Sequence, residues 1–170
     1  TQEVFKADII LKVSPPNEQE IKMMKHKQIL FSALQLSAQP KSTLVKLMEK
    51  KITAIAWDYI EDESGSFPII RSMSEIAGTT SVLIAAELMS NANEGKGLML
   101  GGLAGITPPE LVIIGAGTVG QFAASAALSL GVSVKVFDNS LFKLRRLQNE
   151  IGHKVFTSVI QPKVLEKALK

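Results

Sequence analysis

The stretch Leu111–Gly120, "LVIIGAGTVG", decides the fold of the second half of the chain. Four apolar residues lead into Gly115, Gly117 and Gly120, which are spaced G-x-G-x-x-G. The apolar run predicts a buried strand, and the small residues that follow predict a helix. In such a unit the first glycine permits the tight turn, the second lets the backbone approach a pyrophosphate, and the third lets helix pack on strand. The stretch therefore predicts a dinucleotide-binding turn.

The residues around this turn fit the same interpretation. Thr118 and Val119 open the expected helix, where unpaired N–H groups can face phosphates. Asp138 lies 18 residues after Gly120, at the end of the next apolar run. A carboxylate there can accept hydrogen bonds from an adenosine ribose and would repel a 2′-phosphate, so the expected cofactor is NAD. The alternative is an ordinary glycine turn followed by a surface aspartate that caps the next helix.

A membrane span is the other interpretation of this region. Leu111–Val134 holds 24 residues without a charge, which is long enough to cross a bilayer. The three glycines would weaken such a helix, their spacing is not the G-x-x-x-G of helix dimers, and no cluster of basic residues flanks the segment. We therefore expect no membrane span.

The first half of the chain alternates between strand and helix patterns. Short apolar runs predict strands at 7–13, 28–34 and 52–57, and amphipathic stretches predict helices after Asn17 and at 40–51. Asn17 with Glu20 forms one capping box, and Ser72 with Glu75 predicts a second that opens a long helix to about residue 91. This alternation is typical of a parallel α/β sheet.

A glycine-rich segment at 93–110 separates the two halves. We expect a packed connection there rather than a mobile lid, because Leu98, Met99, Leu100 and Leu103 favour burial. Beyond the glycine turn the alternation resumes, with a strand at 132–138, a helix at 140–151 ended by Gly152, and a strand near 154–159. The fold class is α/β, with two doubly wound, Rossmann-like parallel sheets.

Composition excludes several classes of function. The 170 residues are 46% hydrophobic and contain no cysteine, which excludes disulfides, thiolate metal sites and a cysteine nucleophile and fits a cytoplasmic location. With two histidines we expect no metal site. The net charge of +3 has no basic block, so we expect no nucleic-acid partner. The chain begins at Thr1, which suggests a piece of a longer protein.

Six stretches together resemble one family. They are "ADIILKVSPP", "ILFSALQLSAQP", "ITAIAWDYI", "PIIRSMSEIAG", "GKGLMLGGLAGITPPELVIIGAGTVG" and "VKVFDNSLFKLRRL". In order and spacing they are similar to the alanine dehydrogenase and transhydrogenase alpha-subunit family. The resemblance covers nearly the whole chain and is closest to alanine dehydrogenase.

The resemblance implies two doubly wound domains, both incomplete in this chain. Residues 1–91 would be part of an N-terminal substrate-type domain ending in a long connecting helix, and 92–170 the first half of an NAD-binding Rossmann domain. Family members begin with a strand that bears a substrate-binding arginine, and that strand is absent here, as is the nicotinamide half. The implied function is NAD-dependent hydride transfer with an amino acid/2-oxo acid pair, in a homo-oligomer, and we expect the fragment itself to be inactive.

The resemblance also assigns site residues. Ser74 matches a serine of the cofactor cleft, and the three glycines with Asp138 match the nucleotide turn. The catalytic residues are unknown, because Ser14 stands where alanine dehydrogenases have a substrate-binding lysine and Gln35 where they have a catalytic histidine. Lys12 faces the same side of its strand as Ser14 and is either a substitute cation or a structural residue.

Two alternatives follow from Ser14 and Gln35. Transhydrogenase alpha subunits also lack the lysine–histidine pair, and the "ILKVSPPNEQEI" block looks like theirs. The chain would then belong to the NAD-binding part of a transhydrogenase. Outside enzymes, the alternative is a catalytically silent NAD-binding domain.

Overall fold

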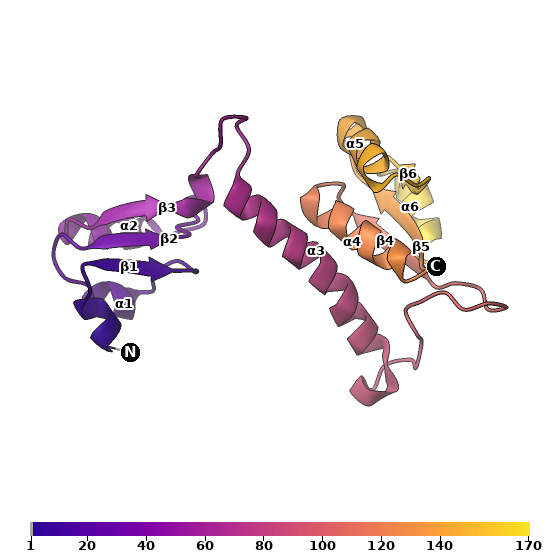
Figure 1. Cartoon of the computed structure of the whole chain (residues 1–170), viewed down its shortest axis with the longest axis horizontal. Coiled ribbons are helices and arrows are strands. Elements are labelled where there is room, and N and C mark those ends of the chain that lie inside the picture. The colour runs from indigo at the N-terminus through magenta and orange to yellow at the C-terminus, as the bar shows by residue number, and fades with distance from the viewer. Residues whose placement is uncertain (1) are drawn as a thin grey trace. The chain divides into compact units, whose positions relative to one another are not determined.

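A computed structural model describes residues 2–170 and divides the chain into two compact units. The first unit ends at Ile70 and the second begins at Arg71. Each unit contains a parallel three-stranded sheet with helices, so the predicted α/β class is confirmed (Figure 1). This division falls in the first turn of the long helix, whereas we expected the boundary after that helix, at residues 91–92.

The first unit has the sheet order β1-β2-β3. Its elements are η1 (Gln2–Lys6), β1 (Ile9–Lys12), α1 (Glu18–Met23), β2 (Ile29–Ser32), α2 (Lys41–Glu49), β3 (Thr53–Ala56) and η2 (Trp57–Tyr59). The first capping box is confirmed, since the Asn17 side chain accepts from the Glu20 amide and the Glu20 carboxylate accepts from the Asn17 amide. The three predicted strands form, each shorter than its apolar run.

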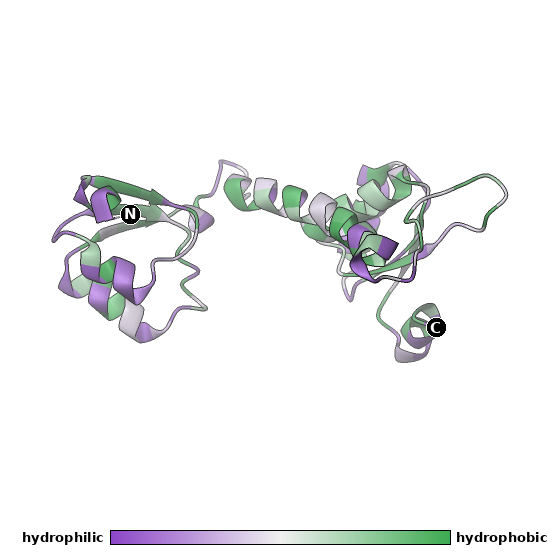
Figure 2. Cartoon of the chain, turned by 90° about the horizontal axis from the view of Figure 1, so that it is seen from below, coloured by the Kyte–Doolittle hydropathy of each residue, from purple (hydrophilic) through white to green (hydrophobic). Residues whose placement is uncertain are grey.

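The two faces of this first sheet differ. One face carries Ile10 and Leu30, which pack with Ile21 and Leu47 of α1 and α2 into the core of the unit. The opposite face places Leu11 beside Phe31 and Ile55 across the three strands, and Leu11 is 74% exposed. Figure 2 shows both helices of this unit on one side of its strands.

The long helix α3 (Pro68–Met89) starts earlier than predicted. Pro68 opens it, since proline suits the first position of a helix. Ser72 therefore lies inside the helix, and the predicted capping box with Glu75 is wrong. The Glu75 carboxylate instead pairs with Arg71 one turn before it, with Nε–Oε1 3.1 Å.

The second unit continues from α3 to a sheet of order β4-β5-β6. Its further elements are η3 (Asn91–Asn93), β4 (Glu110–Ile114), α4 (Thr118–Ser129), β5 (Ser133–Phe137), α5 (Leu141–Ile151), β6 (Phe156–Ser158) and α6 (Pro162–Ala168). α5 ends at Gly152 in the left-handed conformation, as predicted (φ 71°). The core joins Val134 and Val136 of β5 to Ala124 of α4, Leu147 of α5 and Val82 of α3.

The glycine-rich segment after α3 is only partly buried. Leu100 is buried, but Leu98, Met99 and Leu103 are each half or more exposed, so the expected burial of all four is wrong. The segment is fixed at one point, where the Gly102 amide donates to the Leu130 carbonyl over 2.7 Å. A Cβ on Gly102 would lie 2.9 Å from the Gly131 carbonyl oxygen, and one on Gly131 would lie 2.9 Å from the Gly102 Cα.

The uncharged segment Leu111–Val134 is divided among β4, α4 and the start of β5. Its longest helix, α4, has 12 residues. No helix within residues 2–170 has both the length and the apolar character needed to cross a bilayer.

Candidate functional site

The glycine turn connects β4 to α4. Gly115 has φ +110°, a conformation that side chains rarely adopt, and its amide donates to the Phe137 carbonyl over 2.7 Å. A Cβ on Gly120 would overlap the Gly115 carbonyl oxygen, so the third glycine is required by the close approach of α4 to the turn. A Cβ on Gly117 would have no neighbour within 4 Å. The second glycine therefore leaves open space beside the backbone, where a ligand can approach.

The N-terminus of α4 is open to an anion. Gly117 is its N-cap and supplies no side-chain hydrogen bond, so the first-turn amides from Thr118 onward have no capping oxygen. The aligned peptide dipoles of a 12-residue helix add partial positive charge at this end. Amide donors and dipole together favour a phosphate at the turn.

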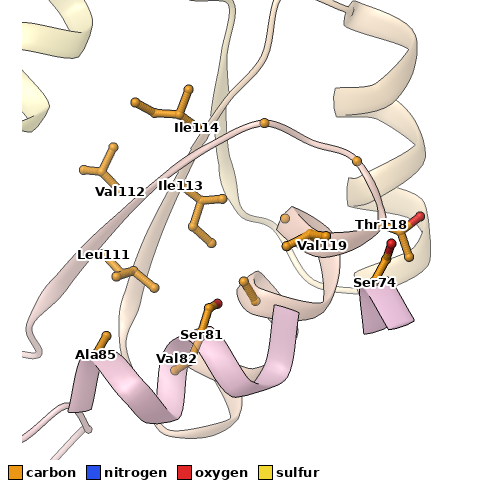
Figure 3. Close-up of a pocket in the computed structure, with 14 residues that line it drawn as sticks. Ser74, Ser81, Val82, Ala85, Leu111, Val112, Ile113, Ile114, Thr118 and Val119 are labelled. Atoms are coloured by element: carbon orange, nitrogen blue, oxygen red, sulfur yellow. The ribbon is translucent and has the colours of Figure 1, made fainter. Parts of the chain in front are cut away.

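A cavity of about 430 Å³ lies beside the turn, between α3, β4 and α4 (Figure 3). Ser74 and Thr118 place their hydroxyls at its glycine end, while Val82, Ala85 and Leu111 line the apolar end (Figure 3). Every residue predicted for the cofactor except Asp138 lines this cavity: Ser74, Gly115, Gly117, Thr118, Val119 and Gly120. The structure thus brings Ser74 of α3 to the turn, although Ser74 lies more than forty residues earlier in the sequence.

Asp138 lies directly after β5 and holds the turn. Its Oδ2 accepts from the Ala116 amide and its Oδ1 from the Ser140 amide, each over 2.7 Å. These backbone donors, Ala116 first, hold the pKa of the Asp138 carboxyl below its usual value. The carboxylate is partly exposed, so an oxygen lone pair can still meet a ribose hydroxyl. The aspartate also fixes the glycine turn, which the sequence did not indicate.

In the first unit, Lys12 lies on the same side of its strand as Ser14, as expected, and the two side chains are in contact. Lys12 Nζ donates to Ser14 Oγ over 2.9 Å and forms an ion pair with Glu20 Oε1 at 3.1 Å. The lysine is therefore already neutralised by the capping glutamate of α1. Ser14 itself has only a hydroxyl, which cannot hold a substrate carboxylate as a cation does.

Gln35 follows β2 in a left-handed conformation with φ 46°. Its backbone is held by Asp58, whose two carboxylate oxygens accept from the Leu34 and Gln35 amides over 2.9 and 2.8 Å. A cavity of about 450 Å³ adjoins Gln35 and Asp58 and is lined also by Tyr59 and Phe67. Among the described residues, no lysine, arginine or histidine lines this cavity. Gln35 can donate and accept hydrogen bonds but cannot exchange a proton near neutral pH.

Two residues of these sites were missed from the sequence. Asp58 lies two residues after β3, within η2, and an aspartate close behind a strand, as at Asp138, was the available signal. Gly78 of α3, where a Cβ would overlap the Val119 carbonyl oxygen of α4, is an isolated glycine inside a helical pattern, which often marks close packing. Among residues 2–170, no three histidine, aspartate or glutamate side chains gather where they could hold a metal ion.

Comparison with known proteins also divides the chain into two parts. The family model described as "Alanine dehydrogenase/PNT, N-terminal domain" matches residues 1–77, and "Alanine dehydrogenase/PNT, C-terminal domain" matches residues 81–170. The chain is 38% identical to an alanine dehydrogenase of Methanococcus maripaludis over 170 residues, covering 99% of the chain and 45% of that protein. It is 37% identical to one of Mycolicibacterium smegmatis, covering 96% and 44%.

Two solved structures also resemble the chain. An L-alanine dehydrogenase superposes with a TM-score of 0.83 at 32% identity, over 98% of this chain and 46% of that one. A transhydrogenase from Sinorhizobium meliloti gives 0.73 at 17% identity, over the same shares, and this likeness concerns the fold alone. The chain spans less than half the length of the relatives that it matches.

Proposed function

The chain belongs to the alanine dehydrogenase/PNT family. We therefore propose that its second unit is the NAD-binding part of an oxidoreductase of the alanine dehydrogenase type. The whole protein would transfer a hydride between NAD and an amino acid/2-oxo acid pair. The observation that carries the proposal is the open space at Gly117, beside an uncapped helix N-terminus.

The residues fit a dinucleotide part by part. The amides at Gly117 and Thr118 would hold the pyrophosphate, and Asp138 would accept from the adenosine ribose. Ser74 would contact the cofactor from α3. The bound NAD supplies the hydride acceptor, and the chain supplies its orientation.

Gly117 permits a direct test. Gly117→Ser introduces a residue that is favoured at a helix N-cap, and the added Cβ would meet no protein atom within 4 Å. The fold should therefore be retained. The introduced side chain would occupy the space proposed for the pyrophosphate. We expect at least a tenfold weaker affinity for NADH by titration calorimetry, with an unchanged unfolding midpoint. Equal NADH affinity in the variant and the unaltered chain would refute the phosphate assignment.

Asp138 also predicts cofactor choice. Its charge would repel the 2′-phosphate of NADPH, so we expect NADH to bind at least tenfold more tightly than NADPH. Asp138→Asn keeps the size of the side chain and removes the charge, and should narrow that ratio. An NADPH affinity equal to that for NADH in the unaltered chain would contradict the assignment.

Transhydrogenase and silent-domain functions remain the alternatives, favoured by Ser14 and Gln35, which provide neither a cation nor a proton carrier. Lys12, paired to Glu20, would be the nearest cation to Ser14. Steady-state assays of the full-length protein separate the three. Turnover of alanine with NAD supports the dehydrogenase, and hydride exchange between two nicotinamides supports the transhydrogenase. NADH binding without either reaction supports the silent domain.

Assembly into a homo-oligomer is a further proposal that rests on the family resemblance, and a cytoplasmic location is a proposal that rests on the lack of cysteine in the sequence. Light scattering of the full-length protein tests the first. Fractionation of the source cells tests the second.

A further inference from the structure

Gly78 lies in the middle of α3, where it is buried against the start of α4. A Cβ at this position would overlap the Val119 carbonyl oxygen, and would lie 2.8 Å from Phe122 Cβ and 3.0 Å from the Ala123 amide nitrogen. All three atoms belong to the first two turns of α4. The backbone of α3 therefore touches α4 where α4 leaves the glycine turn.

This contact cannot relax by a change of rotamer. Two of the three neighbouring atoms are backbone atoms of α4, and the third is a Cβ, whose position the backbone fixes. A helix is less stable with glycine in its interior than with alanine there, so a glycine in the middle of this 22-residue helix needs a local explanation. The close approach supplies that reason.

The contact also lies within the wall of the cavity. α3 contributes Ser74 one turn before Gly78, and Ser81 and Val82 one turn after it. Ser81 Oγ donates to the Gly78 carbonyl over 2.7 Å, which fixes the orientation of that side chain on α3. Val119 and Ala123 of α4 also line the cavity, and they are the two residues whose backbone atoms lie against Gly78.

We propose that Gly78 is a positioning residue for the cofactor: it lets α3 fix the first turn of α4, and so the phosphate-facing amides, against the glycine turn. This rests on the proposed binding of NAD at that turn. Gly78 itself need not touch the ligand. A methyl group at this position would push the α4 N-terminus away from α3 and displace the amides from the pyrophosphate.

The pyrophosphate gives a selective test. ADP-ribose contains it and adenosine does not, while both carry the ribose proposed for Asp138. For Gly78→Ala we expect the Kd for ADP-ribose to rise at least tenfold by calorimetry. The Kd for adenosine, from an NMR titration, should change less than twofold. Thr79→Ala, at the next position and exposed, is the matched control and should change neither value.

The outcomes separate the inference from its premise. If the unaltered chain does not bind ADP-ribose, the cofactor assignment fails and this inference fails with it. If that chain binds both ligands and Gly78→Ala weakens both equally, or neither, Gly78 is a packing residue only and the inference is overturned while the cofactor assignment stands.

A second measurement needs no variant and therefore holds if Gly78→Ala does not fold. Hydrogen exchange on the unaltered chain should show that ADP-ribose slows exchange at amides 78–82 of α3 as well as 118–122 of α4. Adenosine should slow neither set. Protection confined to α4 would overturn the inference.

Discussion

Replacement of Asp138 by alanine should destabilise the second unit even without a nucleotide. The carboxylate accepts from the Ala116 amide on one oxygen and from the Ser140 amide on the other, each over 2.7 Å. Ala116 is fully buried, so its amide would lose its partner without gaining access to water. Asp138→Ala thus removes two hydrogen bonds to a charged group at once.

The expected magnitude follows from those two bonds. A hydrogen bond to a charged group contributes about 1.5–3 kcal/mol, and the partial exposure of Asp138 favours the lower value, so the loss is about 3 kcal/mol. The second unit comprises residues 71–170, and for a domain of that size 1 kcal/mol shifts the melting temperature by roughly 4 °C or more. Asp138→Ala should therefore lower the melting temperature of this unit by about 12 °C.

Calorimetry of the ligand-free chain measures this shift, with Asp138→Asn as the matched control. The asparagine oxygen can accept from one amide, while its NH₂ group faces the other, so about half of the loss should remain. A midpoint for Asp138→Ala within about 2 °C of the parent value would refute the reasoning. The experiment also affects how ligand data are interpreted, because weaker NADH binding by Asp138→Ala alone would not separate a lost ribose contact from a loosened turn.

Further predictions concern the turn, the charge and the two cores. Gly120→Ala should cost about 2 kcal/mol or more, measured by urea unfolding, because its Cβ would overlap the Gly115 carbonyl oxygen; an unchanged midpoint would contradict this. The lowered pKa of Asp138 means that its contribution is complete above the unfolded value, about 3.9, and is lost as pH falls through the lower folded pKa. Below about pH 4, the free energy of unfolding of Asp138→Ala should therefore fall less steeply with pH than that of the parent. Equal slopes for the two proteins would contradict this prediction. Asn17→Ala should lower the free energy of unfolding of the first unit by about 1 kcal/mol, because it removes the N-cap of α1. Equal stability of variant and parent would show that the capping box does not stabilise the unit. Leu147→Ala should cost about 2–5 kcal/mol because the side chain is fully buried, and a loss under about 1 kcal/mol would contradict that packing.

The alternation of strands and helices could be predicted because each apolar run is short and is ended by a strong local signal. Asn17 capped α1 and Gly152 ended α5 as expected, since both act within one turn of the chain. The start of α3 was mispredicted for the same reason. Ser72 and Glu75 match a capping box locally, but Pro68 and the two isoleucines after it already form a helical turn.

The site could be predicted in part. Gly115, Gly117 and Gly120 lie within six consecutive residues, so their spacing in the sequence already determines the geometry of the turn. The local signals at Gly78 and Asp58 do not tell what either residue contacts, because each contact is with a segment more than twenty residues away. Burial of the glycine-rich segment was mispredicted because hydrophobicity alone does not say which side of a loop has a partner.

The close backbone contact between Gly102 and Gly131 has a consequence for genetic screens. Each glycine leaves room only for backbone atoms of the other segment, so a side chain at either position collides with main chain rather than with the partner's side chain. A harmful substitution at one of them therefore cannot be suppressed by a substitution at the other, because glycine is already the smallest residue. In a saturation screen the two positions should both be intolerant, yet they should never appear as a compensating pair.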